Sequence, residues 1–171
     1  RSSLVGSEMC IRDRDNGVIV SALVAVNAVG EIVDTVSNTV VAGIRANDVG
    51  QYDSAINVAI GNTAKVPVAG TNTTLGLIAT NANLSKAQLK KVAEMAHDGM
   101  ARAIRPIHTQ FDGDTVFAVS MPLSEVETTP DAQLNSIGIA GAKALEFAIV
   151  DAVRSAKSVG DVVACCDWHI D

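Results

Sequence analysis

Two threonines, Thr73 and Thr74, follow Asn72 in the middle of the chain and lead into an apolar stretch. A threonine hydroxyl is a weak nucleophile unless a base lies beside it, and an N-terminal threonine supplies that base through its own α-amine. An α-amine ordinarily titrates at about pH 7.7–8.0, which suits a general base. Inside a chain such a terminus requires self-cleavage, in which the hydroxyl attacks the preceding carbonyl and the resulting ester is hydrolysed. The Asn72–Thr73 bond fits this chemistry, although a threonine before a strand is also ordinary strand composition.

Polar residues elsewhere in the chain could assist such a nucleophile. Asp112 and Asp114 flank Gly113 ahead of a second apolar stretch. Two carboxylates so close could share a proton, and one of them could instead pair with the ammonium of Thr73. The same residues also make an ordinary surface turn. Asn27 ends an apolar stretch, where local side-chain bonding to the backbone would terminate a strand.

The histidines and cysteines give weaker signals. His97 falls on a predicted helix and His108 just past it, so both are expected to be helix-face or loop residues without a catalytic role. A cluster near the C-terminal end could ligate a metal, but it lacks the second ligand pair of a structural zinc site, so no metal is expected. This cluster consists of Cys165, Cys166, Asp167 and His169.

The candidate residues lie at the ends of predicted secondary-structure elements. The predicted strands are residues 18–26, 31–34, 39–42, 74–81 and 114–121, and the predicted helices are residues 85–105 and 130–157. The first strand is apolar on both faces and is expected to be buried on both sides. Residues 45–72 read as a long irregular connection with a short helix within residues 52–60. This order of elements indicates an α/β fold in which helices cover sheets.

The two long helices carry clear end signals. Ser85 and Gln88 are spaced as a capping box, and Pro106 marks the end of the first helix. Pro130 suits the first turn of the second helix. Gly138 and Gly141 in that helix predict a close contact with the sheet.

Composition excludes several classes of protein. The 171 residues are 48% hydrophobic and 19% charged, which suits one domain with a buried core. The net charge of −6 argues against a nucleic-acid or anionic-membrane partner. No charge-free apolar stretch is long enough to span a bilayer. The adjacent cysteines suit a reducing compartment, so a cytoplasmic protein is expected.

Residues 1–14, RSSLVGSEMCIRDR, show neither a helical nor a strand period. They resemble adapter-derived translation found at the ends of proteins inferred from metagenomic reads. We therefore expect this segment, with Cys10, to be non-native and assign no element to it.

Three segments in combination resemble the L-aminopeptidase/D-esterase family, and especially its nylon-oligomer endohydrolase branch, the 6-aminohexanoate-oligomer hydrolases. They are VSALVAVNAVGEIVD (residues 20–34), GTNTTLGLIATNA (70–82) and KAQLKKVAEMAHDGMARAIRPIHTQFDGDTVFAVS (86–120). The resemblance implies a four-layer αββα sandwich of the self-processing N-terminal-nucleophile type. Residues 15–72 would be the C-terminal part of the α-subunit region, and residues 73–171 would be the β-subunit region of the same domain.

The resemblance also implies roles for individual residues. Thr73 is the implied nucleophile after cleavage at Asn72–Thr73, and Asn27 stabilises the oxyanion through its side-chain amide. Asp112 and Asp114 match the acidic pair that orients the nucleophile and its amine. The implied enzyme acts on small linear amides or peptides and needs no cofactor. Its two pieces stay together, and it forms homo-oligomers.

The chain departs from the family pattern at both ends, since its C-terminal stretch GDVVACCDWHID (residues 160–171) also has no match in that pattern. The family carries a long segment before the VNAVG strand, including an active-site lysine, and Lys65 does not match that position. We therefore expect a fragment that lacks the N-terminal part, for which self-processing is an open question. Two alternatives remain: an acyltransferase of the ornithine acetyltransferase type, which passes the acyl group to an amine, and an unprocessed, inactive family member.

Overall fold

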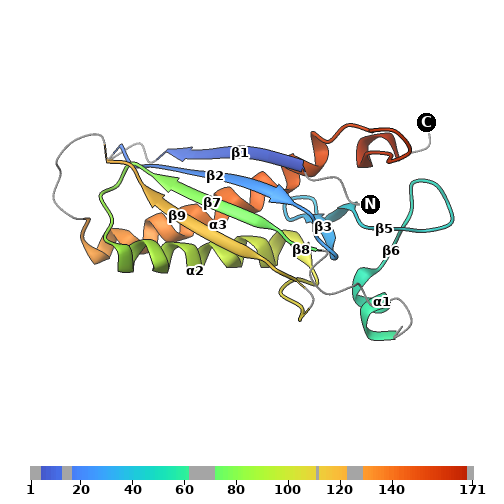
Figure 1. The fold of residues 1–171 in the computed structure, drawn as a ribbon, viewed down its shortest axis with the longest axis horizontal. Helices are drawn as coiled ribbons and strands as arrows, with labels where there is room; N and C mark the ends of the chain where they lie inside the picture. The colour runs from blue at the N-terminus through green and yellow to red at the C-terminus, as the bar shows by residue number, and fades with distance from the viewer. Residues whose placement is uncertain (1–4, 13–16, 62–71, 111, 123–128, 169–171) are drawn as a thin grey trace.

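A four-stranded sheet, in the order β1-β2-β7-β9, organises the structure (Figure 1). The computed structural model describes residues 5–12, 17–61, 72–110, 112–122 and 129–168. The strands are β1 (Val5–Arg12), β2 (Ile19–Val26), β7 (Leu75–Thr80) and β9 (Thr115–Ser120). β1, β2 and β7 pair antiparallel, whereas β7 and β9 pair parallel. The predicted strands at residues 18–26, 74–81 and 114–121 are thus confirmed to within one or two residues.

Two long helices, α2 (Lys86–Ala103) and α3 (Asp131–Arg154), pack against each other and against one face of this sheet (Figure 1). The core between them is built from small and β-branched side chains together with a few larger ones. Its fully buried members include Ala22, Val24, Ile78, Val92, Met100, Leu145 and Ile149. Of the four layers of an αββα sandwich, these described residues make one helix layer and one sheet layer.

Smaller elements lie beyond one end of the four-stranded sheet. β3 (Glu31–Asp34), β4 (Thr39–Ala42) and β8 (Ile104–Arg105) form a three-stranded sheet, and β5 (Ile44–Arg45) pairs with β6 (Tyr52–Asp53). In the described ranges the structure also has α1 (Ala55–Gly61) and a short 3-10 helix, Cys165–Asp167. The connection expected to be irregular therefore contains three short elements, and its residues 62–71 lie outside the described part. Ile104, expected on the helix, instead belongs to β8 and pairs with Ile32.

The expectation that residues 1–14 form no element is wrong. Val5–Arg12 is a strand that pairs with β2 along its whole length, from Val5 opposite Val26 to Arg12 opposite Ile19. Ladder pairing joins backbone groups, so it needs no alternating side-chain pattern. The non-native origin of the segment stays a prediction, and β1 now covers an edge of β2 that would otherwise be unpaired.

The expectation that the first strand is buried on both sides is also wrong for the described residues. β2 buries alternate residues under the helices, whereas Leu23 on its other face is 50% exposed. Leu23 lies opposite Leu77, which in turn pairs with Phe117, itself 58% exposed. The side of the sheet away from the helices is therefore an accessible apolar surface, which we call the open face.

The helix ends follow the expected capping chemistry. The Ser85 side chain accepts a hydrogen bond from the Gln88 backbone, and the Gln88 side chain accepts one from the Ser85 backbone, so the capping box is confirmed. Pro130 is the N-cap of α3. The two glycines of α3 have different neighbours: Gly141 contacts Ile78 of the sheet, as expected, but Gly138 lies against Met95 of α2. The predicted sheet contact of Gly138 is therefore wrong. No helix in the described part of the chain is long and apolar enough to cross a membrane.

Candidate active site

The sheet register brings Asn27, Thr73 and Gly113 into one row just beyond the ends of β2, β7 and β9. The β2–β7 pairing continues past Ala25 and Leu75, and the Thr73 amide donates a hydrogen bond to the Asn27 carbonyl at 3.0 Å. The β7–β9 pairing likewise extends to a bridge between Asn72 and Asp112. Segments far apart in the sequence thus meet at one end of β7, where the bond between Asn72 and Thr73 lies.

The two threonines face opposite sides of the sheet because successive residues of an extended chain alternate in direction. Thr74 is fully buried on the helix side, and its hydroxyl has no hydrogen-bond partner among the described atoms. Thr73 is partly exposed and precedes Leu75, which is 44% exposed on the open face. Only the first hydroxyl is therefore accessible from the open face.

The carbonyl oxygen of Asn72 accepts two hydrogen bonds. The Thr73 hydroxyl donates one at 2.7 Å, and the Gly113 amide donates the other at 3.2 Å. Gly113 has no side chain to intrude, and a methyl group there would lie 2.8 Å from the Thr73 hydroxyl oxygen. The nucleophile candidate and a backbone donor thus converge on one carbonyl oxygen, and a backbone N–H aimed at such an oxygen is the kind of donor that stabilises an oxyanion.

The structure separates the two aspartates of the acidic pair by their contacts. Asp112 closes its own turn, since its carboxylate accepts a hydrogen bond from the Thr109 amide at 2.8 Å. The Asp114 side chain is 4% exposed, and its Oδ1 accepts the Thr74 amide at 2.9 Å. Asp114 therefore holds the backbone immediately after Thr73, whereas Asp112 shapes the loop that carries Gly113.

Sequence reasoning missed the contact between His108 and Asp114. The His108 ring lies with Nδ1 3.1 Å from Asp114 Oδ2, and its Nε2 lies 3.2 Å from Nδ1 of His97. His108 has a left-handed backbone conformation with φ of 56°. Burial lowers the pKa of His97, and the neighbouring His108 lowers it further. Nothing in the spacing of these residues indicates the contact, because it depends on the fold of the turn after β8.

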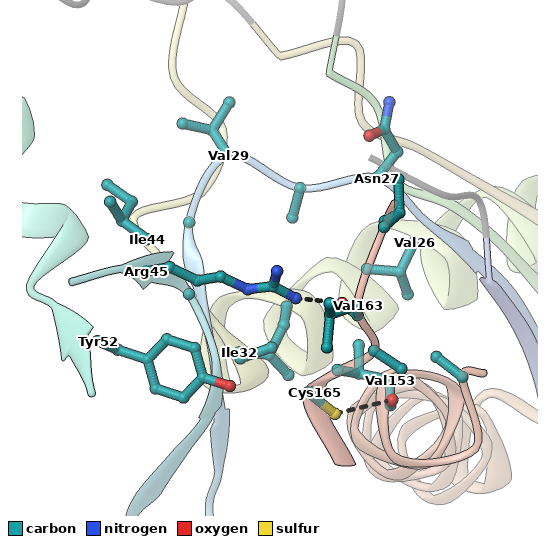
Figure 2. Close-up of a pocket in the computed structure, with 17 residues that line it drawn as sticks. Val26, Asn27, Val29, Ile32, Ile44, Arg45, Tyr52, Val153, Val163 and Cys165 are labelled. Atoms are coloured by element: carbon teal, nitrogen blue, oxygen red, sulfur yellow. Dashed lines mark hydrogen bonds between the residues drawn. The ribbon is translucent and has the colours of Figure 1, made fainter. Parts of the chain in front are cut away.

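A cavity of about 500 Å³ lies next to Asn27, between β3, β5 and the end of α3 (Figure 2). Most of the residues that line it have apolar side chains, and Arg45 reaches across it to the carbonyl of Val163. Of the described site residues only Asn27 lines the cavity, and Figure 2 shows its amide directed away from Arg45 and Val163. The cavity therefore adjoins the candidate site without containing the Thr73 hydroxyl.

The cysteine cluster near the C-terminal end contacts the end of α3. Cys165 donates to the Val153 carbonyl at 3.1 Å, and burial raises the pKa of its thiol. Cys166 lies 3.4 Å from the Ala156 carbonyl. Within the described residues, no group of three or more His, Cys, Asp or Glu side chains could hold a metal ion, and His169 lies outside them.

Solved structures define the class of fold. The chain superimposes on the L-aminopeptidase D-Ala-esterase/amidase of Ochrobactrum anthropi with a TM-score of 0.59 and 18% identity, covering 94% of this chain and 42% of that one. That structure is described as a variant of the N-terminal-nucleophile (Ntn) hydrolase fold. A β-aminopeptidase from Burkholderia gives a TM-score of 0.50 at 21% identity, covering 90% and 42%. The α/β fold described above is thus of the Ntn-hydrolase type.

Sequence comparisons then give the family. The pattern of peptidase family S58 matches residues 3–164, and the chain belongs to this family. It is 35% identical over 162 residues to an uncharacterized aminopeptidase of Mycobacterium leprae, covering 89% of this chain and 45% of the relative. It is also 34% identical over 146 residues to a 6-aminohexanoate-oligomer endohydrolase of Paenarthrobacter ureafaciens, covering 81% and 39%. The chain therefore spans less than half the length of these relatives.

Proposed function

We propose that the protein is a self-processing amidohydrolase that is cut between Asn72 and Thr73 and then uses Thr73 to cleave linear amides or peptides. One observation carries the proposal: the Asn72 carbonyl accepts hydrogen bonds from both the Thr73 hydroxyl and the Gly113 amide. Membership of a peptidase family and relatives named aminopeptidase and oligomer endohydrolase support the same chemistry.

Self-cleavage would proceed by an acyl shift. The Thr73 hydroxyl oxygen attacks the Asn72 carbonyl carbon while the Gly113 amide stabilises the negative charge that develops on the carbonyl oxygen. The peptide C–N bond breaks, the Thr73 nitrogen takes up a proton, and an ester joins Asn72 to the Thr73 oxygen. Water hydrolyses this ester, which leaves a carboxylate on Asn72 and a free hydroxyl and α-amine on Thr73.

Substrate hydrolysis would reuse the same atoms. The new α-amine accepts the proton of the Thr73 hydroxyl, the oxygen attacks a substrate carbonyl, and the amine product leaves. Water then releases the acyl group from its ester. The Thr73 nitrogen lies 3.0 Å from the Asn27 carbonyl, which would keep the amine in place, and the Asn27 side-chain amide is the proposed oxyanion donor. No cofactor takes part in these steps. The two pieces would stay together because β7 is paired on both sides.

The mass of the purified protein, followed over time, tests the proposal. Wild-type protein should convert to two pieces that separate between Asn72 and Thr73, and Thr73→Ala should remain intact. Thr74→Val is the matched control, because it keeps the backbone and removes only a buried hydroxyl without a described partner. This variant should cleave like the wild type.

Three results would overturn the proposal. If wild-type protein stays uncut on incubation, the self-processing reading fails. If Thr73→Ala is still cut at this bond, or if Thr74→Val is not, the nucleophile is misassigned. Turnover of a peptide amide by the processed protein, with and without an added amine acceptor, then separates a hydrolase from an acyltransferase.

A further inference from the structure

A hydrogen-bonded chain runs from the surface of α2 to the backbone beside Thr73. His97 on α2 contacts His108, and His108 contacts Oδ2 of Asp114 through both its ring at 3.1 Å and its amide at 3.4 Å. The other carboxylate oxygen, Oδ1, accepts the Thr74 amide at 2.9 Å. Each member of this chain therefore restricts the position of the next one.

We propose that His108, supported by His97, is a positioning residue that fixes the carboxylate of Asp114 and thereby the backbone that carries Thr73. This inference rests on the proposed function, which does not itself assign any role to a histidine. His108 acts through Asp114 and does not contact the Asn72 carbonyl or the Thr73 hydroxyl in the described structure.

The contacts define which ring nitrogens carry protons. A carboxylate can only accept, so Nδ1 of His108 must donate to Asp114. In a neutral His108 ring the Nε2 atom is then an acceptor, and it receives the Nδ1 proton of His97. The resulting chain is directed from His97 to His108 to Asp114.

Because Asp114 is buried, its carboxylate depends on the hydrogen bond that the His108 ring donates. Its side chain is 4% exposed, whereas the His108 side chain is 39% exposed, so the histidine supplies a hydrogen bond where solvent access to the carboxylate is restricted. Hydrogen bonds to charged groups are stronger than those between neutral groups, so a buried carboxylate that loses its donor is destabilised. Removing the ring would let the carboxylate shift, and the Thr74 amide would shift with it.

The backbone conformation of His108 determines which substitution can test this role. A left-handed φ of 56° is uncommon for a residue other than glycine, but asparagine also tolerates it. The side-chain amide of asparagine can donate to a carboxylate, as Nδ1 of histidine does. His108→Asn is therefore a conservative variant that keeps the donor and the backbone conformation while removing the link to His97.

The pair also makes the arrangement sensitive to pH. Two imidazolium rings cannot share this contact, since both facing nitrogens would then be donors. The charged groups around the pair in the described residues are Asp114 and Asp98, both of which favour protonation of His97, while burial and His108 oppose it. Because the pKa of His97 is lowered, its ring stays neutral through neutral pH, and the His97–His108 contact should persist there.

The test measures the rate of Asn72–Thr73 cleavage by mass spectrometry between pH 5 and pH 9. His108→Ala should slow cleavage by roughly 10- to 100-fold across this range. His108→Asn should recover most of the rate. Adding His97→Ala to His108→Asn should change the rate little, because the link between the two side chains is already removed. Glu94→Gln, which changes an exposed carboxylate on the same helix that pairs with Lys90 and Lys91, is the control and should cleave like the wild type.

The outcomes separate this inference from the proposed function. If wild-type protein cleaves and His108→Ala cleaves equally fast at every pH, the positioning role is wrong and the nucleophile assignment stands. If wild-type protein does not cleave, the proposed function fails, and nitrogen chemical shifts of the rings decide the rest. In uncut Thr73→Ala protein, His108 should be the Nδ1–H tautomer and should lose that preference when Asp114→Asn is added. A His108 ring that does not respond to Asp114→Asn would overturn the contact itself.

Discussion

Gly113 and Thr73 lie so close that a methyl group on Gly113 would be 2.8 Å from the Thr73 hydroxyl oxygen. Real contacts of a Cβ atom are longer, so Gly113→Ala must push this hydroxyl away from its position against the Asn72 carbonyl. We expect the rate of self-cleavage to fall by about 100-fold, comparable to the loss of one oxyanion-hole donor or of a well-placed reacting group. Mass spectrometry over time gives the rate, and circular dichroism checks that the variant is folded.

The matched control for this change is Gly61→Ala at the end of α1. An added methyl group there meets nothing within 4 Å in the described structure, so cleavage should proceed at the wild-type rate. A Gly113→Ala protein that cleaves as fast as Gly61→Ala would show that the Thr73 hydroxyl does not need its observed position.

A second glycine fixes the distance between the two long helices. A methyl group on Gly99 of α2 would lie 2.1 Å from the Ala142 carbonyl oxygen of α3, and a backbone atom cannot move aside as a flexible side chain can. Gly99→Ala should therefore lower the free energy of unfolding by about 1–3 kcal/mol, despite the better helix propensity of alanine. Urea denaturation of Gly99→Ala and Gly61→Ala measures this, and equal midpoints for the two variants would contradict the tight contact.

Glu146 is a buried carboxylate in the middle of α3. It accepts hydrogen bonds from Thr35 and from Lys143, the latter at 2.7 Å, and Arg102 lies 3.6 Å away. Burial alone would raise the pKa of Glu146, but the hydrogen bonds from Lys143 and Thr35 outweigh it, and the net pKa is lowered. Glu146→Gln should cost about 1–3 kcal/mol of unfolding free energy near neutral pH.

The pH dependence of that cost follows from linkage. Because the pKa of Glu146 in the folded state is lower than its ordinary value of 4.5, the stabilisation is present above that pH and is lost as the pH falls through the folded pKa. The difference between Glu146→Gln and wild type should therefore shrink in acid. Glu94→Gln, which removes only exposed ion pairs, should change stability by less than about 0.5 kcal/mol at any pH. A constant deficit for Glu146→Gln would contradict the ion pairing.

Asp34 should also make the stability depend on pH, at lower pH than Glu146 does. The backbone amide of Val36 and then the Arg154 guanidinium, 2.6 Å away, lower the pKa of Asp34 from 3.8 to about 2. The unfolded state therefore binds more protons in this window, and the stability contributed by Asp34 is lost as the pH falls from about 4 to about 2. Asp34→Asn should flatten stability against pH there, and Arg154→Gln should remove part of the same dependence. Urea titrations at pH 5, 4, 3 and 2 measure both slopes.

The local signals of the sequence predicted the scaffold well. The capping box at Ser85 and Gln88 and the strand after Thr74 follow from nearest-neighbour chemistry, and the structure has both. β1 was missed because its residues carry no side-chain period, whereas the edge of β2 requires only backbone groups to pair. Gly138 was given the wrong neighbour because a small residue on a helix predicts close approach but not the identity of the approaching element.

The candidate site depends on register, which the sequence does not contain. Asn27, Thr73 and Gly113 lie just beyond the ends of β2, β7 and β9, and only the observed pairing of these strands aligns them in one row. The contact of His108 with Asp114 needs a left-handed residue and a turn that no propensity specifies. Side-chain alternation, by contrast, was available from the sequence and could have separated Thr73 from Thr74.

The interior position of β7 in the sheet has a consequence for how the processed protein would unfold. β7 lies between β2, which precedes the Asn72–Thr73 bond, and β9, which follows it. Once this bond is cut, the ladder between β2 and β7 joins two molecules, and unfolding changes from a unimolecular to a dissociative reaction. Refolding of the processed protein would then depend on concentration, whereas that of the uncut Thr73→Ala protein would not. Processed protein that has unfolded at low concentration would therefore refold slowly, because its two pieces must first meet.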